Sequence, residues 1–260
     1  MEKKDSMKRH MSVFMLFVRN SFYKIALVLG VMAAAESLWF IRTRKVLEKQ
    51  QLSGEALALL PEILVEKAGL CHFFSVAMLA VVFFLLCIGR SSTGHSEYTL
   101  YRLRISPRSV FIWQSVYNIC CFFILWGVQV LVLYGLCGQY IETAAASAVT
   151  HQSLYLAYYR SEFMHTMLPL NNVWGWIWMV LWLVLLGVAT AWELLLEREG
   201  KHSSWLTFFA MIGWNFLIRK SEERAAMIFF SFVFAAVLLY FIYRIFVKEE
   251  WKLDGTARKS

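Results

Sequence analysis

The sequence contains few charged residues for its length. Asp, Glu, Lys and Arg make up 17% of its 260 residues, whereas roughly a quarter is usual in soluble domains. Hydrophobic residues make up 59% and aromatic residues 17%, which is more apolar side chain than soluble domains of this size contain. The composition therefore excludes an ordinary soluble domain and predicts an integral membrane protein.

The sequence also lacks the short motifs of common catalytic sites. It contains no GxxxxGK[ST] loop for nucleotide phosphates, no HExxH helix and no GxSxG turn. Its five cysteines show no CxxC spacing, which argues against a disulfide framework or a metal site. His151 and His165 share a polar stretch with Glu142 and Glu162, but such scattered residues are expected on the surface rather than around a metal. We therefore predict no catalytic, cofactor-binding or metal-binding residue in this chain.

The formal net charge of +8 does not indicate nucleic-acid binding. The basic residues lie between long apolar runs, as they do in membrane proteins whose cytoplasmic loops are enriched in Lys and Arg. The 11 tryptophans suit a chain with two water–lipid interfaces, because tryptophan gathers at both. A lipid bilayer, and no nucleic acid, is the expected environment.

The N-terminal residues 1–21 combine a basic head with an apolar face. Met, Phe and Val side chains recur at helical spacing from Met7 to Val18, which predicts an amphipathic helix in the membrane interface. A basic flank that only sets topology is the alternative. Residues 22–41 follow as the first predicted span, about the 20 residues that a bilayer core requires. Ala33–Ala35 resembles a signal-peptidase site, but the apolar run resumes after it, so an uncleaved helix is expected.

The apolar runs predict an all-α, polytopic membrane protein with about six transmembrane helices. The predicted spans are residues 22–41, 69–89, 109–137, 173–196, 204–218 and 225–247. Together they form a transmembrane domain, 22–247, between the interfacial helix and a charged tail, 248–260. The segment 204–218 is short for a membrane span, because its helix would measure only roughly 22 Å and the bilayer core is about 30 Å thick. It is either a short span that borrows flanking residues or a re-entrant segment.

The distribution of basic residues orients the spans. With six spans and both termini in the cytoplasm, most Lys and Arg fall on the cytoplasmic side, and the asymmetry shrinks if 204–218 does not cross. We therefore expect a multi-pass plasma-membrane protein with cytoplasmic N- and C-termini. Residues 138–172, which contain the single basic residue Arg160, then form an external stretch. The segment from Leu154 to Leu168 is predicted to be helical and to stop near Pro169.

A few ionisable or amide side chains fall inside the predicted spans, where burial costs free energy unless they are paired or solvated. The candidates for an intramembrane polar path are Glu36, Gln114, Asn118, Gln129 and Glu193. Gln114 and Asn118 are four residues apart and share one helix face. The alternative is that both glutamates lie near the headgroups while the amides hydrogen-bond neighbouring helices, so the sequence assigns no substrate site.

The polar segment 90–108, RSSTGHSEYTLYRLRISPR, separates two long apolar runs. It carries four arginines and one glutamate, and the charge bias places it in the cytoplasm. Its apolar and aromatic residues form a helical stripe made of Tyr98, Tyr101, Leu103 and Ile105. Tyr and Arg are enriched in protein–protein contacts, so the segment is a candidate surface for a partner. An arginine-rich connector that only sets topology is the alternative.

This order of parts resembles the membrane subunits of type-2 ATP-binding-cassette (ABC) exporters. In that family, the loop between the second and third of six spans forms a coupling helix, followed by a turn of Leu-Pro-(Ile/Val)-Ser-Arg character. Here Tyr98–Tyr101 fall at the coupling helix and Leu103–Arg108 at the turn, with Arg104 in place of the expected proline and Pro107 three residues later. The external stretch is longer than the family leads us to expect. By this resemblance, the ATPase-coupling residues are Glu97, Tyr98, Leu100, Tyr101, Arg102, Leu103, Arg104 and Ile105.

The resemblance implies a transmembrane permease subunit that exports an amphipathic or hydrophobic cargo, either a peptide or a lipid-like molecule. Its partners would be a cytoplasmic ABC ATPase subunit and a second copy or a related permease. ATP and Mg would be bound by the ATPase, this chain would hold no cofactor, and the plasma membrane would be bacterial. A non-transporting sensor, assembly or immunity protein that acts through the external helical stretch is the alternative. An intramembrane enzyme is disfavoured, because a plausible set of catalytic residues is missing.

Overall fold

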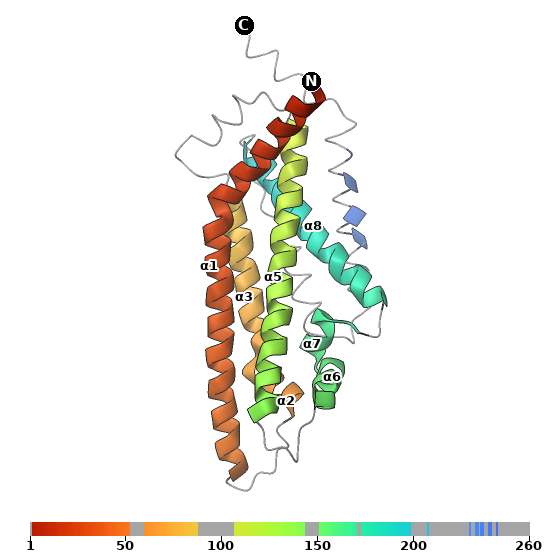
Figure 1. Cartoon of the computed structure of the whole chain (residues 1–260). Coiled ribbons are helices and arrows are strands. Elements are labelled where there is room, and N and C mark those ends of the chain that lie inside the picture. The colour runs from red at the N-terminus through yellow and green to blue at the C-terminus, as the bar shows by residue number, and fades with distance from the viewer. Residues whose placement is uncertain are drawn as a thin grey trace.

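The computed structural model describes residues 2–52, 60–87, 107–143, 151–170 and 173–198, together with single residues between Thr207 and Tyr243. Every helix or strand in these five ranges is an α-helix. The helices are α1 (Glu2–Leu52), α2 (Pro61–Ala68), α3 (Leu70–Cys87), α5 (Pro107–Thr143), α6 (His151–Arg160), α7 (Glu162–Met167) and α8 (Val173–Arg198). Figure 1 shows α1, α3 and α5 side by side in a bundle that α8 crosses, with α2, α6 and α7 gathered at one end.

Four of these helices contain segments long and apolar enough to cross a membrane. The segments are Phe14–Lys49, Leu70–Cys87, Arg108–Thr143 and Val173–Leu196, and each overlaps one of the first four predicted spans. The fold is therefore that of an α-helical membrane protein, as the composition predicts. The predicted spans 204–218 and 225–247 lie almost wholly outside the described residues, as do the segment 90–106 and the tail 248–260.

α1 joins two predicted elements that were expected to meet at residue 21. The predicted interfacial helix and the first span form one helix of 51 residues, which continues past Arg42 to Leu52. Residues 2–52 contain no proline and a single glycine, Gly30, so no strong helix-breaking residue interrupts the segment. Figure 1 shows the N-terminal part of α1 inclined to the rest of the helix.

α5 also extends further than its predicted span. It begins at Pro107, at a helix start, where the missing proline N–H leaves no hydrogen bond unmade. It ends at Thr143, so residues 138–143, which the sequence analysis placed in the external stretch, continue the helix of the third span. A helix of 37 residues measures about 55 Å, well beyond a core of about 30 Å. One part of α5 therefore extends out of the bilayer core.

The predicted helix 154–168 is divided into α6 and α7. Ser161 adopts an extended conformation, with φ −76° and ψ 122°, and this turn separates the two helices. α7 ends at Met167, two residues before Pro169. Proline cannot continue a helix with normal hydrogen bonding, which agrees with the predicted stop.

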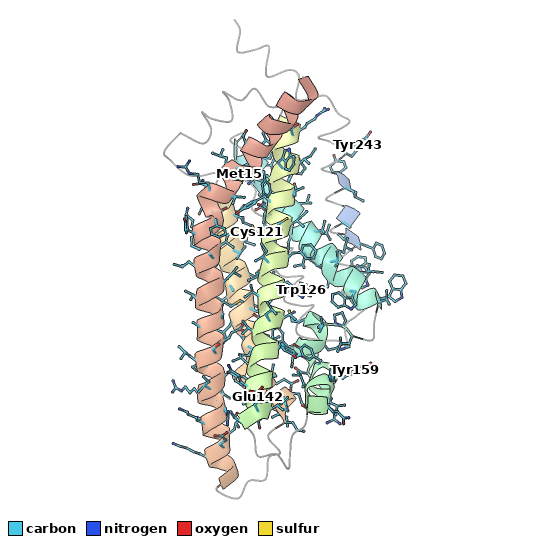
Figure 2. The ribbon with its side chains drawn as sticks, in the orientation of Figure 1. Met15, Cys121, Trp126, Glu142, Tyr159 and Tyr243 are labelled. Carbon is cyan, nitrogen blue, oxygen red and sulfur yellow. The ribbon has the colours of Figure 1, made fainter. Side chains whose placement is uncertain are left out.

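α2, α6 and α7, called here the cap, pack beside the C-terminal half of α5, and α2 also contacts α1 (Figure 1). The carboxylate of Glu62 on α2 pairs with Arg160 on α6 at 3.4 Å. Trp126 Nε1 on α5 donates a hydrogen bond to the Met167 carbonyl oxygen at 2.9 Å, which holds the end of α7 against the middle of α5 (Figure 2). Between α2 and α3 the chain turns at Gly69, whose φ of 60° lies in the left-handed region that glycine adopts at low cost.

The apolar core lies between the long helices. Phe74 and Val81 on α3, Phe122 on α5, and Trp182 and Leu186 on α8 are almost completely buried. α1 and α5 run parallel, since Phe14 packs against Trp113 near their starts and Arg44 bonds to Thr143 near their ends. Because α5 also packs against α3 and α8, it is the central helix of the described bundle.

Candidate functional site

The structure buries all five side chains proposed for an intramembrane polar path. Glu36 and Gln129 have no exposed surface, and Asn118 is 1% exposed. Gln114 and Glu193 are also buried. These groups lie inside the helix bundle rather than against lipid, which agrees with the rule that intramembrane polar residues face the protein interior.

Glu36 and Gln129 meet between α1 and α5. Gln129 Nε2 donates a hydrogen bond to Glu36 Oε2 at 3.1 Å. Within the described residues no basic side chain pairs with Glu36, and its second oxygen, Oε1, has no hydrogen-bond partner there. A buried carboxyl group with one amide partner is incompletely satisfied, and such a group costs free energy to keep inside a protein.

Asn118 joins α5 to α8. Its Nδ2 atom donates a hydrogen bond to Thr190 Oγ1 at 2.9 Å and lies 3.5 Å from the Gly187 carbonyl oxygen. Thr190 Oγ1 in turn donates to the Leu186 or Gly187 carbonyl oxygens, each at 3.0 Å. The amide therefore makes an inter-helix contact, which is the alternative that the sequence analysis offered for the amides.

Glu193 lies near the end of α8, and Gln114 lies near the start of α5. Glu193 Oε1 accepts a hydrogen bond from the backbone N–H of Thr207 at 2.8 Å. This contact holds Thr207, nine residues beyond the end of α8, against the helix. Gln114 Nε2 has no hydrogen-bond partner among the described residues, although Gln114 shares its helix face with Asn118, as predicted.

These polar groups form separate contacts in the described part of the chain and not one continuous path. Asn118 and Gln129 are both on α5, but eleven residues separate them, which corresponds to roughly 16 Å along the helix. Asn118 bonds to α8, whereas Gln129 bonds to α1. The arrangement can hold three helices in register, and a connected row of polar groups that would solvate a cargo across the bundle is not present in these ranges.

Two inter-helix contacts were not anticipated from the sequence. Ser21 on α1 and Tyr117 on α5 share a hydrogen bond between their hydroxyl groups. Gly187 on α8 approaches α5 so closely that a Cβ atom there would lie 2.4 Å from Ile119 Cγ1 and 2.8 Å from the Ile119 nitrogen. A glycine followed by Thr190 and Ala191 inside a span is a signal of close helix packing, and it identifies this interface.

The tyrosines of α6 differ in their exposure to the surface. Tyr158, in the external helical stretch through which the alternative function would act, is 4% exposed, and burial raises the pKa of its phenol above the ordinary value. Tyr155 and Tyr159 are the exposed aromatic residues of α6, and Figure 2 shows Tyr159 on the side of α6 away from the bundle. The exposed face of the cap is thus aromatic and next to Arg160.

The ATPase-coupling residues from Glu97 to Ile105 lie outside the described residues. Among the described residues, no group of three or more His, Cys, Asp or Glu side chains is arranged to hold a metal ion. His165 packs instead beside the ring of Tyr159, with ring centroids 6.1 Å apart.

The fold and these contacts define a class: a multi-helix membrane protein whose central helix is held by buried polar contacts on two sides. No protein-family model matches the chain, and neither the curated proteins nor the solved structures contain a significant match.

Proposed function

We propose that this protein is the permease subunit of an ATP-driven exporter of the ABC type, moving a hydrophobic or amphipathic peptide or lipid-like cargo across a bacterial plasma membrane. The chain contributes helices to the membrane path, and a separate cytoplasmic ATPase binds ATP and Mg. A second copy, or a related permease, completes the path.

The observation that carries the proposal is the contact between the first part of α1 and the start of α5. The ring of Phe14 packs edge-on against Trp113 and Tyr117, at centroid distances of 6.0 and 5.8 Å. Ser21, seven residues after Phe14 on α1, hydrogen-bonds to the same Tyr117. α5 begins at Pro107, directly after the segment that resembles a coupling helix. Movement of that segment would pass into α5 and, through this contact, into α1.

The central place of α5 supports the same mechanism. α5 makes polar contacts with two different helices. Gln129 bonds to Glu36 on α1, and Asn118 bonds to Thr190 on α8. A tilt of α5 driven from its Pro107 end would change both interfaces together, because packed helices transmit displacement as rigid elements. Alternate arrangements of α5 would open and close the path between two permease subunits.

The test is co-purification of an ATPase with the tagged, full-length protein from its native membrane in mild detergent. The double variant Tyr101→Ala/Leu103→Ala removes the apolar stripe of the proposed coupling segment. Tyr155→Ala/Leu156→Ala removes the same two residue types from the exposed face of α6 and is the matched control. We expect the ATPase to co-purify with wild type and with the α6 variant, and to be lost from Tyr101→Ala/Leu103→Ala. Recovery of folded wild-type protein without any ATPase would contradict the proposal.

A second candidate, a sensor, assembly or immunity protein, is favoured by the exposed aromatic face of α6. Tyr155 and Tyr159 are 68% and 52% exposed, and tyrosine is enriched at binding sites. This candidate predicts the reverse pattern: the α6 variant loses its partner or its phenotype, while Tyr101→Ala/Leu103→Ala behaves like wild type.

A further inference from the structure

An apolar groove runs between α1 and α3. It has a volume of about 400 Å³, and every residue that lines it except His72 is apolar. Its walls include Leu27, Val31 and Ala35 from α1, and Phe73, Val76 and Ala80 from α3. The volume falls in the range of about 300–1,000 Å³ that small-molecule sites occupy.

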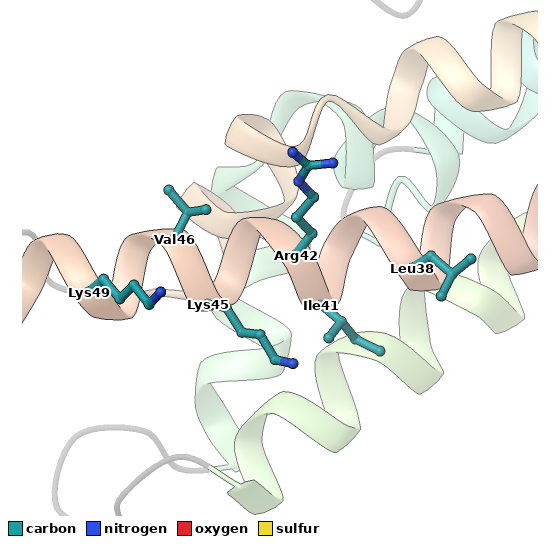
Figure 3. Close-up of a pocket in the computed structure, with 6 residues that line it drawn as sticks. All are labelled: Leu38, Ile41, Arg42, Lys45, Val46 and Lys49. Atoms are coloured by element: carbon teal, nitrogen blue, oxygen red, sulfur yellow. The ribbon is translucent and has the colours of Figure 1, made fainter.

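A second hollow continues along the same side of α1. It measures about 330 Å³ and is lined by Leu38, Ile41, Arg42, Lys45, Val46 and Lys49. Figure 3 shows these six side chains arranged along successive turns of α1. Leu27, Val31, Ala35 and Leu38 are three or four residues apart, and so are Arg42, Lys45 and Lys49, so one side of the helix changes from apolar to basic.

The basic residues of the second hollow differ from their neighbour Arg44. Arg44 pairs with Glu48 at 2.6 Å and lies over the ring of Tyr140. Arg42, Lys45 and Lys49 are exposed, and none of them makes an ion pair within the described ranges. The guanidinium of Arg42 lies 5.4 Å from the ring centroid of Trp39, and tryptophan is a residue typical of the membrane–water interface.

The dimensions match one leaflet of a bilayer. From Leu27 to Leu38 the apolar side of α1 measures roughly 16 Å, about half of a core of roughly 30 Å. The basic residues begin at Arg42, where the predicted span 22–41 ends. An apolar groove one leaflet deep, with cations at the headgroup level, is complementary in shape and charge to a phospholipid with an anionic headgroup.

We propose that the two hollows form one site for an anionic phospholipid, with an acyl chain in the α1–α3 groove and the phosphate headgroup on Arg42, Lys45 and Lys49. The site is independent of the exporter proposal, because it uses no residue of the coupling segment. A bound phospholipid fills the groove between α1 and α3, which otherwise present an uneven surface to the bilayer. The lipid contacts both helices and so connects α1 to α3.

The experiment is lipid binding to the purified full-length protein by native mass spectrometry from neutral detergent. Dioleoyl-phosphatidylglycerol is compared with dioleoyl-phosphatidylcholine, which carries the same acyl chains. We expect one phosphatidylglycerol to be retained preferentially. Arg42→Gln/Lys45→Gln removes two cations, each worth about fivefold in affinity for an anionic lipid, so the affinity is expected to fall about 25-fold. Arg19→Gln/Lys24→Gln makes the same chemical change on exposed residues at the other end of the span and is expected to leave the affinity within about twofold.

The groove is tested separately by Val76→Phe, which places a larger side chain in its wall. Val116→Phe on α5 is the matched control, since both valines are exposed and only Val76 lines the groove. We expect Val76→Phe, but not Val116→Phe, to release both lipids, because the two lipids carry the same acyl chains. Equal affinity for the two lipids, or equal loss in the Arg42 and Arg19 variants, would overturn the headgroup assignment. A lipid-free dimer that Val76→Phe dissociates would show that a second copy of the chain occupies the groove, and would also overturn the proposal.

Discussion

Glu36 on α1 and Gln129 on α5 form one of the buried hydrogen bonds between these two helices. Both are completely buried, and the amide of Gln129 is the hydrogen-bond partner of the carboxyl group. A buried polar group that loses its partner costs about 1–3 kcal/mol, whereas replacing both partners by apolar groups can be nearly neutral.

Gln129→Leu is therefore expected to lower the free energy of unfolding by about 1–3 kcal/mol. The double variant Glu36→Leu/Gln129→Leu should recover most of that loss, because no polar atom of the pair remains buried. Unfolding in mixed detergent–dodecyl sulfate micelles measures both changes. Gln139→Leu, at an exposed position of the same helix, is the control and should change stability little. If the double variant is less stable than Gln129→Leu, the pair is not an isolated contact.

At the scale of helices, the crossing of α5 and α8 depends on the absence of a side chain at Gly187. A Cβ atom there would meet both the side chain and the backbone of Ile119. The Asn118–Thr190 hydrogen bond lies at the same crossing, with a donor–acceptor distance of 2.9 Å. Close approach and hydrogen bonding together are typical of helix association inside membranes.

Gly187→Ala is expected to cost about 1–3 kcal/mol, because α5 and α8 must move apart. Adding Ile119→Ala should restore only part of the loss, since the contacts to the Ile119 nitrogen and Cα remain. Gly127→Ala is the matched control: nothing lies within 4 Å of its Cβ position, and alanine favours a helix by about 1 kcal/mol over glycine. Thermal unfolding in detergent measures the change in stability of Gly187→Ala and of Gly127→Ala. A neutral Gly187→Ala would mean that the helices cross further apart.

At the scale of the whole molecule, the start of α1 and the cap lie at opposite ends of the bundle (Figure 1). Under the proposed orientation, the start of α1 faces the cytoplasm and the cap faces outward. Positive charge at both ends of α1, including Arg42, Lys45 and Lys49, weakens the charge asymmetry as a guide to this orientation.

Cysteine labelling in intact cells measures the orientation directly. In a cysteine-free variant, Tyr155→Cys on α6 should react with a membrane-impermeant maleimide added outside. Arg19→Cys near the start of α1 should react only after the cells are opened. Both positions are exposed, so a difference in labelling reports the side of the membrane. Labelling of both from the same side would contradict the proposed topology.

The sequence by itself determined the class of fold, because each span is a local property of a continuous apolar run. Prolines also mark two helix ends, the start of α5 at Pro107 and the end of α7 near Pro169. The full length of α1 differs from the predicted span, because the helix continues through the mixed-charge residues after Arg42 and no proline or glycine follows before Leu52.

Only the tertiary structure decided which polar residue meets which. The sequence singled out Glu36, Gln114, Asn118, Gln129 and Glu193 because each is costly to bury, but a helix face has several possible neighbours. Packing pairs Gln129 with α1 and Asn118 with α8. It also places the apolar side of α3 against the apolar half of one face of α1, and the other half of that face is basic. Partners that are distant in the chain are selected by how whole helices fit together, and local sequence carries little of that information.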